Sequence, residues 1–570
     1  MKKKKLLAIV LALSMILVGC SLNQENTTSS KENNKSGINS EYINLTMVSP
    51  TTINPVLNND KSVAYIMNLV YDGLFTIDQN YNTVPQLVEE YSIASDGKSI
   101  NIKLKDAKWH DGKSVTSRDV KFTIELIQKN SDSPYNIFTK NISSVKIENS
   151  KEFAISFKEQ YAFSKDTLIF PIVSQNILSG KSSDEILTNS NNLIGNGPYK
   201  IENMKDRAGM TLVVNKDYYS ELPETMRDIK VGIVPSEEDQ VSMIIALESD
   251  IGRVSLGDLS KFYEDEFNIT NYEGRNYESI IFNYDNEYLK DENFRKAITH
   301  AIDKKLILEE GYIGNGKLVN FPLNTKSKYY DSDVQALSYD KEKAESYLQK
   351  INPLNNKNEF TNEDNKSEVE NSNNSLDIKS SENNSDNKTN NDINSQSNDE
   401  SAGNKELTEK ERKELISKVD LKIIANKDNE ERIKAANIVS ENLDAIGIKS
   451  TVVGLTEKEM TTALSQKDYD LAFVGWELSS VPDARSIIQA SGYSDEKLTN
   501  YMNSLASATS DSQIAEIYSG IQTHLRDKAA FISLVIRNEY IVTNRRLQGK
   551  SEPNDFDVYE GISNFTLKNK

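Results

Sequence analysis

Cysteine, tryptophan and histidine are scarce in this chain, which has one, two and three of them among 570 residues. Cys20 lies near the N-terminus, so the rest of the chain has no thiol for a disulfide, a metal ligand or a nucleophile. None of His110, His300 and His524 has a second ligand at the spacing of a metal motif such as H-E-x-x-H. We therefore expect no metal or cofactor site, and a solvent-facing or structural role for each histidine.

Sequence signatures of common enzyme classes are also missing. The chain has no G-x-S-x-G motif, no P-loop and no dinucleotide-binding glycine fingerprint. The segment GNGPY at residues 195–199 lacks the lysine and the helix start that phosphate binding requires. These absences favour a binding protein over an enzyme. A hydrolase that uses a serine or a carboxylate is left open, because such a site needs no contiguous motif.

Positive charge is in short supply: 67 Lys and Arg residues stand against 86 Asp and Glu residues, for a net charge of −19. A chain this acidic has no basic face with which to displace counterions from a nucleic acid, so we expect no nucleic-acid partner. Its hydrophobic content of 37% is sufficient for real cores, and its length allows two or more domains.

The N-terminus has the pattern of a secretion signal. Lys2 to Lys5 precede a 13-residue apolar stretch, residues 6–18, which is too short to span a bilayer, and the stretch ends in LVGC. LVGC resembles a bacterial lipobox, which implies removal of residues 1–19 and diacylation of Cys20. We expect lipid attachment to the extracytoplasmic face of the cell membrane, with polar residues 20–41 as a flexible tether. A simple signal peptide with a leftover cysteine is the alternative.

One internal segment lacks the apolar residues needed to form a hydrophobic core. Residues 352–404 contain 17 asparagines among 53 residues, and 11 acidic against 4 basic side chains. Such a segment buries too little apolar surface to offset the entropy of ordering. We expect a disordered insertion within a domain, with an interdomain linker as the alternative.

The rest of the chain mixes helix and strand patterns. EYINLTMV alternates as a strand, residues 99–115 read as a hairpin that turns at HDGK, and Thr116 to Asp119 match a capping box. Asp291 is a plausible N-cap for an amphipathic helix over FRKAITHAIDKK. After the insertion, a helix that stops at Gly447 alternates with strand-like IKSTVV and YDLAFVGW. This alternation predicts an α/β layer in which Trp476 lies where a strand leaves the sheet.

Six short elements follow one another between residues 54 and 120. They are Asn54-Pro55, Gly73-Leu74, Pro85-Gln86-Leu87, Asp96-Gly97, Trp109 to Gly112 and Asp119-Val120. Their order and spacing resemble the opening of the family 5 extracellular solute-binding proteins, the oligopeptide- and dipeptide-binding lipoproteins of ATP-binding cassette importers. The likeness continues through IGNGPYKI, the FRKAITHAIDKK helix and YDLAFVGW to about residue 549, interrupted by the Asn-rich insertion.

The resemblance implies an α/β, two-lobed periplasmic-binding-protein-like fold with an extra domain in the first lobe. Lobe one would comprise residues 42–275, with 538–570 returning to it, and lobe two residues 276–537. Members of the family close by hinge motion on a ligand in the interlobe cleft.

The implied function is capture of peptides, held through backbone hydrogen bonds, and delivery to the permease and ATPase subunits of an importer. A monomer without enzymatic activity is expected. The alternatives are a non-peptide ligand such as a nickel chelate or a saccharide, a surface hydrolase, and a sensor that binds peptide without import.

The resemblance also implies ligand contacts near the end of YDLAFVGW. Gly475 and Trp476 would line the cleft, and peptide-binding members often have an aspartate shortly afterwards that pairs with the peptide α-ammonium. No aspartate lies between Trp476 and Pro482. Glu477 and Asp483 flank the missing position, so either of them, or only water, meets the amino terminus.

Two further candidates follow from position alone. Tyr277 resembles a ligand-facing aromatic residue on the family's lobe-crossing strand, although a structural role is equally open. Arg485 either meets a ligand carboxylate or pairs with Asp483, and we favour the pair. Trp109 belongs to the turn signature and is expected in the core.

Overall fold

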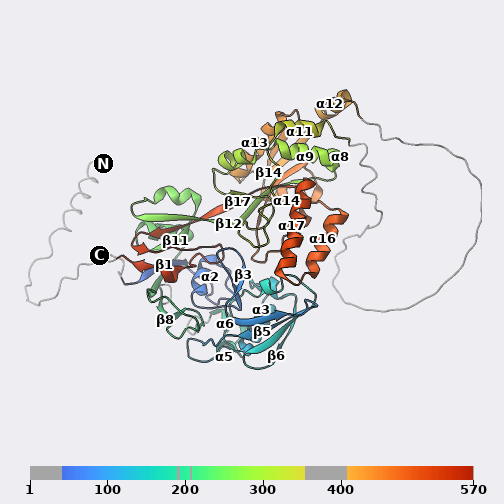
Figure 1. The fold of residues 1–570 in the computed structure, drawn as a ribbon. Coiled ribbons are helices and arrows are strands. Elements are labelled where there is room, and N and C mark those ends of the chain that lie inside the picture. The colour runs from blue at the N-terminus through green and yellow to red at the C-terminus, as the bar shows by residue number, and fades with distance from the viewer. Residues whose placement is uncertain (1–40, 189–192, 206–207, 353–406, 569–570) are drawn as a thin grey trace, which may run out of the picture. The chain divides into compact units, whose positions relative to one another are not determined.

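The computed structural model describes residues 41–188, 193–205, 208–352 and 407–568. The predicted signal peptide, Cys20, nearly all of the tether and the Asn-rich insertion after residue 352 lie outside the described residues. Helices and strands alternate along the rest of the chain (Figure 1). Among these residues, no helix has both the length and the apolar character needed to cross a bilayer.

Two four-stranded sheets come from the N-terminal half of the chain. In the first sheet, β1 pairs in parallel with β10, and its alternating Ile43, Leu45 and Met47 are buried, as the sequence pattern predicted. The second sheet is antiparallel throughout. The first sheet has the order β1 (Ile43–Val48), β10 (Ile229–Val234), β9 (Gly209–Val214), β8 (Tyr199–Lys205), and the second β4 (Val88–Ile93), β5 (Ser99–Leu104), β7 (Glu152–Phe157), β6 (Ile142–Ile147).

A third, seven-stranded sheet is built around two long antiparallel strands. Its order is β11 (Ile251–Val254), β17 (Ile532–Asn544), β12 (Phe267–Phe282), β16 (Leu471–Glu477), β14 (Asp420–Asn426), β15 (Lys449–Leu455), with β13 (Lys317–Leu318) beside β17. β14 pairs in parallel with both β15 and β16, which confirms the predicted α/β layer. Two short ribbons complete the strands: β2 (Phe75–Ile77) with β3 (Thr83–Pro85), and β18 (Leu547–Gln548) with β19 (Thr566–Leu567).

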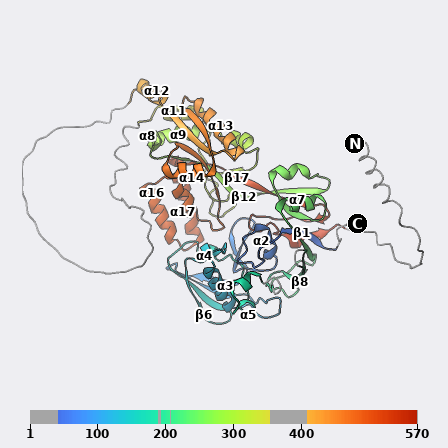
Figure 2. The same cartoon turned by 180° about the vertical axis from the view of Figure 1, so that it is seen from behind.

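The helices fall into two sets along the chain, one before strand β12 and one after it. The first set is α2 (Lys61–Asn68), α3 (Ser117–Lys129), α4 (Asn136–Thr139), η1 (Lys165–Thr167), α5 (Gln175–Leu178), α6 (Ser183–Thr188), α7 (Glu237–Ile245) and η2 (Leu256–Lys261). The second is α8 (Glu287–Lys290), α9 (Glu292–Ala301), α10 (Lys304–Leu306), η3 (Ile307–Gly311), α11 (Lys341–Leu348), α12 (Glu409–Ser417), α13 (Glu430–Asp444), α14 (Glu457–Gln466), α15 (Arg485–Ala490), α16 (Glu496–Ser507) and α17 (Asp511–Asp527), with η5 (Ile562–Asn564) near the C-terminus. α13 packs on β14 and β15, and α16 lies beside α17 (Figure 2).

Local sequence signals set several helix ends as predicted. Thr116 and Asp119 form the capping box of α3. The Asp291 side chain accepts hydrogen bonds from the first turn of α9, and Gly447, with φ +82°, follows the end of α13. Each of these contacts joins residues three or fewer positions apart or depends on one glycine, so it follows from local sequence.

The predicted hairpin over residues 99–115 is wrong in its extent. The turn at HDGK is present, with Gly112 at φ +86°, but it closes a single bridge between Lys108 and Ser114. β5 pairs instead with β4 and β7, which occupy both of its edges. The helix α3 begins at Ser117, so the chain has no room for a return strand.

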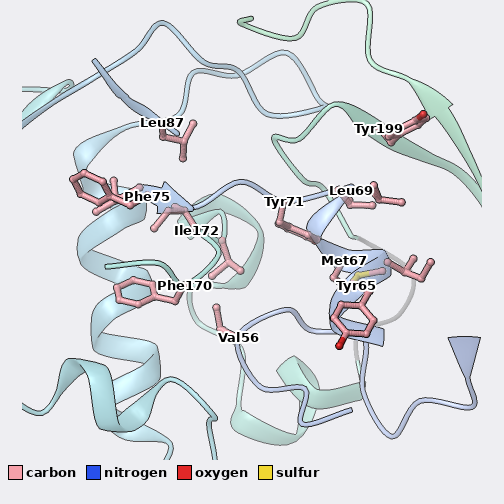
Figure 3. Packing of buried hydrophobic residues seen from close by; sticks show 14 of the residues in the cluster. Val56, Tyr65, Met67, Leu69, Tyr71, Phe75, Leu87, Phe170, Ile172 and Tyr199 are labelled. Atoms are coloured by element: carbon pink, nitrogen blue, oxygen red, sulfur yellow. The ribbon is translucent and has the colours of Figure 1, made fainter. Parts of the chain in front are cut away.

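The two largest hydrophobic cores draw on different stretches of the chain. One core is formed by residues 43–251, Tyr272 and residues 541–565, and a second by residues 280–535. Figure 3 shows Phe75, Phe170 and Ile172 together in the first core. The boundaries predicted at 275/276 and 537/538 fall inside β12 and β17, next to a register shift between Glu273 and Tyr277.

All three histidines are held by the protein itself. His110 Nε2 donates to the Gly197 carbonyl at 3.1 Å, and burial lowers the His110 pKa to about 4. His300 is buried against the Tyr347 ring rather than solvent-facing, because α11 covers the outer face of α9. His524 lies 2.8 Å from an Asp495 carboxylate oxygen. No three His, Cys, Asp or Glu side chains of the described residues are grouped to hold a metal.

The GNGPY segment has a packing role. The backbone N–H groups of Asn196 and Gly197 both donate to the Val70 carbonyl oxygen. A Cβ atom added to Gly195 would lie 1.9 Å from that oxygen, which is well inside contact distance. The segment thereby fixes the end of α2 against the start of β8.

We predict that Gly195→Ala lowers the free energy of unfolding by about 2–3 kcal/mol, because the added methyl group forces the backbone apart. Urea unfolding monitored by circular dichroism measures this change. Gly257→Ala is the matched control, since the space around Gly257 is open and exposed, and it should change stability by less than about 0.5 kcal/mol. Equal effects of the two substitutions would contradict the packing role.

Candidate ligand-binding site

A cavity of about 650 Å³ lies between helix α2, the end of strand β16 and the segment before the C-terminus. From β12 and β16 it is lined by Arg275, Glu477, Ser479 and Ser480. From the N-terminal half it is lined by Asn58 to Lys61, Ala64, Tyr65, Asn68, Tyr71, Gly73, Thr76, Ile77, Gln86, Pro134, Tyr135, Phe138, Ile169 and Pro171, and from the C-terminal segment by Asp555 to Asp557 and Glu560. The volume is within the range of sites for small organic ligands.

Glu477 is the only predicted ligand contact that lines this cavity. It is the last residue of β16, and its Oε1 lies 2.5 Å from Arg275 Nη2 and 2.7 Å from Lys61 Nζ. Partial burial raises the pKa of Glu477, but the two cations outweigh this effect and hold the pKa below its usual value. The carboxylate is therefore ionised and already has two cationic partners.

Arg275 joins three separate parts of the chain. Its Nε donates to Asp555 Oδ2 at 2.9 Å, its Nη1 donates to the Leu478 carbonyl at 2.8 Å, and its guanidinium lies 4.2 Å from the Phe556 ring. Planar guanidinium groups are suited to such combined pairing and stacking. The Arg275 side chain thereby holds the end of β16 and the C-terminal segment at fixed positions on the cavity wall.

Tyr277, Trp476 and Gly475 do not line the cavity. Tyr277 is fully buried, and its hydroxyl lies 2.6 Å from Ser533 Oγ, so it is a core residue in this structure. Trp476 is opposite Tyr277 in the strand pair, and their rings lie 6.0 Å apart. Because neighbouring residues of a strand face opposite sides, Glu477 points to the cavity and Trp476 away from it. The half-buried Trp476 does lie where a strand leaves the sheet.

A steric constraint explains why residue 475 is a glycine. A Cβ atom at Gly475 would lie 1.9 Å from Arg432 Nη2. Arg432 is held there by Glu278, with Nε to Oε2 at 2.7 Å. The glycine leaves room for this ion pair.

Asp483 and Arg485 form the pair that the sequence favoured. Arg485 Nε and Nη2 donate to the two Asp483 oxygens at 2.9 and 2.6 Å, and the Tyr161 hydroxyl donates to Asp483 Oδ2 at 3.0 Å. Asp483 lines a small hollow of about 30 Å³ that shares Arg275, Ser479 and Ser480 with the large cavity. Neither Asp483 nor Arg485 lines the large cavity.

Ser479 and Ser480, which follow β16, line the cavity. The N–H and C=O groups of Ser479 and Ser480 have no hydrogen-bond partner among the residues that the structure describes. On β16 itself, pairing with β14 stops at Ala472, so the following residues have a strand neighbour on one side. An extended ligand backbone is able to pair with such groups.

Sequence reasoning missed the lining residues Lys61, Asp555, Asp557 and Glu560. Each of them lies far along the chain from Glu477; Arg275 and Asp555 are 280 positions apart. No local motif marks the segment SEPNDFDVYE as part of a site.

Comparisons with known proteins agree on one family. The sequence model of the bacterial extracellular solute-binding proteins, family 5 (middle region), matches residues 82–393, which is more than half of the chain. The oligopeptide-binding protein AppA of Bacillus subtilis is 22% identical over 98% of this chain and 98% of its own length.

Solved structures of similar proteins share the fold. The ABC transporter substrate-binding protein CtaP of Listeria monocytogenes has a TM-score of 0.68 at 19% identity, over 93% of this chain and all of its own. NikZ of Campylobacter jejuni, solved with Ni(L-His), has a TM-score of 0.57 at 20% identity, over 93% of this chain and all of its own. The predicted α/β, two-lobed fold is confirmed by these likenesses.

We predict that Arg275→Gln lowers the free energy of unfolding by about 3–5 kcal/mol, because it leaves the buried Asp555 carboxylate without its cation. Lys61→Gln is the matched control. The Lys61–Glu477 pair is half exposed on both sides, so its loss should cost at most about 1 kcal/mol. Urea unfolding of the two variants measures both changes. A loss below 1 kcal/mol for Arg275→Gln would show that the guanidinium does not hold the cavity wall.

Proposed function

This chain belongs to the family 5 bacterial extracellular solute-binding proteins, and from that membership we propose that it captures peptides in the large cavity and delivers them to an ATP-binding cassette importer. The open backbone groups at Ser479 and Ser480 carry this proposal. Backbone pairing recognises any peptide, because every residue offers the same N–H and C=O groups. The name of the Bacillus subtilis relative, an oligopeptide-binding protein, supports the same ligand class.

The cavity lies between elements of both predicted lobes. Lys61 comes from α2 and Glu477 from the end of β16, and their ion pair crosses from one to the other. Strands β12 and β17 contribute residues to both of the two largest hydrophobic cores. A hinge in these two strands, near the register shift after Glu273, would open the cavity to a ligand.

We also propose where in the cell the protein acts. The lysines before residue 6, the 13-residue apolar stretch and LVGC support export and attachment through lipid at Cys20. Attachment at the extracytoplasmic face keeps the protein beside its permease and ATPase subunits. A monomer is sufficient for this task, because the cavity is complete within one chain.

A nickel chelate is the main competing ligand, because the similar protein NikZ was solved with Ni(L-His). The cavity lining contains no histidine, so a chelate here would have to bring its own nitrogen ligands. The lining offers aromatic rings, carboxylates and free backbone groups, which suit a peptide better.

We predict that protein purified from cells carries a ladder of co-purified peptides. Native mass spectrometry of the intact protein, followed by release and sequencing of the ligand, detects them. The peptides should share little sequence, because backbone pairing dominates their recognition. Finding only chelates, saccharides or no ligand would refute the proposal, and turnover of a peptide library would support the hydrolase instead.

We also predict that peptide binding changes the fluorescence of Trp476 and leaves that of Trp109 unchanged. Trp109 is buried in the first core, whereas Trp476 is half-buried and precedes the cavity residue Glu477. Trp476→Phe should therefore abolish the fluorescence change while Trp109→Phe retains it. Retention of the change in Trp476→Phe would place the binding site away from the end of β16.

A further inference from the structure

We infer that the C-terminal segment forms a subsite for a cationic group of the ligand, built by Asp555, Asp557 and Glu560. This inference rests on the proposed function, because it names the chemistry that the same cavity selects. The three carboxylates line the cavity, and Asp555 shares the Arg275 guanidinium with Glu477. The segment has no part in the sequence motifs that mark the family.

The segment holds its carboxylates in place. Asn554 Oδ1 accepts hydrogen bonds from the N–H groups of Phe556 and Asp557 at 2.8 and 2.9 Å. Asp557 Oδ1 accepts one from the Tyr559 N–H at 3.0 Å, and Asn68 Nδ2 of α2 donates to the Phe556 carbonyl at 3.0 Å. A cationic ligand group would therefore meet carboxylates that are already positioned.

Carboxyl groups outnumber basic side chains on the cavity wall. Five carboxylates line the cavity, those of Asp60, Glu477, Asp555, Asp557 and Glu560, and two cations, Lys61 and Arg275. Both cations bind Glu477, and Arg275 also binds Asp555.

Asp557 and Glu560 have no cationic partner. Among the described residues, no Lys, Arg or His nitrogen lies within ion-pair distance of either carboxylate. Burial, together with the negative charge of Glu560, raises the pKa of Asp557, and burial raises that of Glu560. The raised pKa values favour the protonated forms, and a cation bound beside the two groups would stabilise their ionised forms.

Asp555 supplies an independent observation. It is 5% exposed, and its Oδ2 pairs with Arg275 while its Oδ1 has no hydrogen-bond partner among the residues that the structure describes. A buried carboxylate oxygen without a donor is costly, and native proteins rarely leave one so. An ammonium or guanidinium group in the cavity is a donor of the required charge.

The aromatic lining suits the same group. Tyr65, Tyr71, Tyr135 and Phe138 line the cavity together with the carboxylates. Ring faces attract cations and also contact the methylene stem of a lysine or arginine side chain. The subsite chemistry is therefore that of a monocation, supplied either by a basic side chain or by the α-ammonium of a peptide.

Isothermal titration calorimetry of the full-length protein with four pentapeptides separates these sources. The peptides have alanine at four positions and, at the centre, lysine, norleucine or glutamate, each N-acetylated; the fourth is pentaalanine with a free amino terminus. We expect the lysine peptide to bind at least about tenfold more tightly than the norleucine peptide, and the glutamate peptide to bind more weakly than both. Tight binding of free pentaalanine alone assigns the subsite to the α-ammonium.

Matched variants locate the effect. Asp557→Asn and Glu560→Gln should each reduce the preference for the cationic peptide by about tenfold and leave the norleucine peptide within about twofold. Glu552→Gln removes the same charge from an exposed position of the same segment, outside the cavity lining, and should change neither affinity. Circular dichroism checks that each variant is folded.

Equal affinity of the wild-type protein for the lysine, norleucine and glutamate peptides, with free pentaalanine binding no more tightly than they do, would overturn the subsite while leaving peptide capture intact, and it needs no variant. Binding of none of the peptides would refute peptide capture. In that case the subsite is tested by titrating the protein with arginine methyl ester, a cationic compound that contains a single residue. Its binding to the wild-type protein and loss in Asp557→Asn supports the subsite, and failure to bind overturns it.

Discussion

The guanidinium group of Arg275 lies between two carboxylates from distant parts of the chain, Glu477 at the end of β16 and Asp555 near the C-terminus. The nearly buried Asp555 requires a positive partner, and Arg275 supplies it. The same group donates to the Leu478 carbonyl and stacks on Phe556. It thereby fixes the direction in which β16 leaves the sheet and the path by which the C-terminal segment returns to the cavity.

The cavity lining contains two unlike sets of groups. Glu477 has two cations, and the backbone groups of Ser479 and Ser480 have no hydrogen-bond partner among the described residues. Asp557 and Glu560 have no cationic partner in the described part of the chain. Backbone pairing contributes affinity that is independent of sequence, whereas an unbalanced charge discriminates between ligands. A peptide-binding protein that combines the two would accept many sequences and still prefer a positive one.

Local features of the fold were predictable because they depend on neighbouring residues. The capping box of Thr116 and Asp119, the N-cap Asp291 and the glycine stop at Gly447 all lie where the sequence places them. The pairing of β5 was not predictable in this way. Its two edges pair with β4 and β7, which lie outside the predicted hairpin. The role of Tyr277 depended similarly on which face of β12 meets the core.

The sequence by itself determined the family, the α/β class and the unusual composition of residues 1–41 and 352–404, since each is written in contiguous residues or in ordered motifs. Only the tertiary structure decided that Glu477 rather than Trp476 lines the cavity, and that Asp555 lies on the cavity wall beside Arg275. Charge interactions depend on distance in space, and 280 residues of chain separate Arg275 from its partner Asp555.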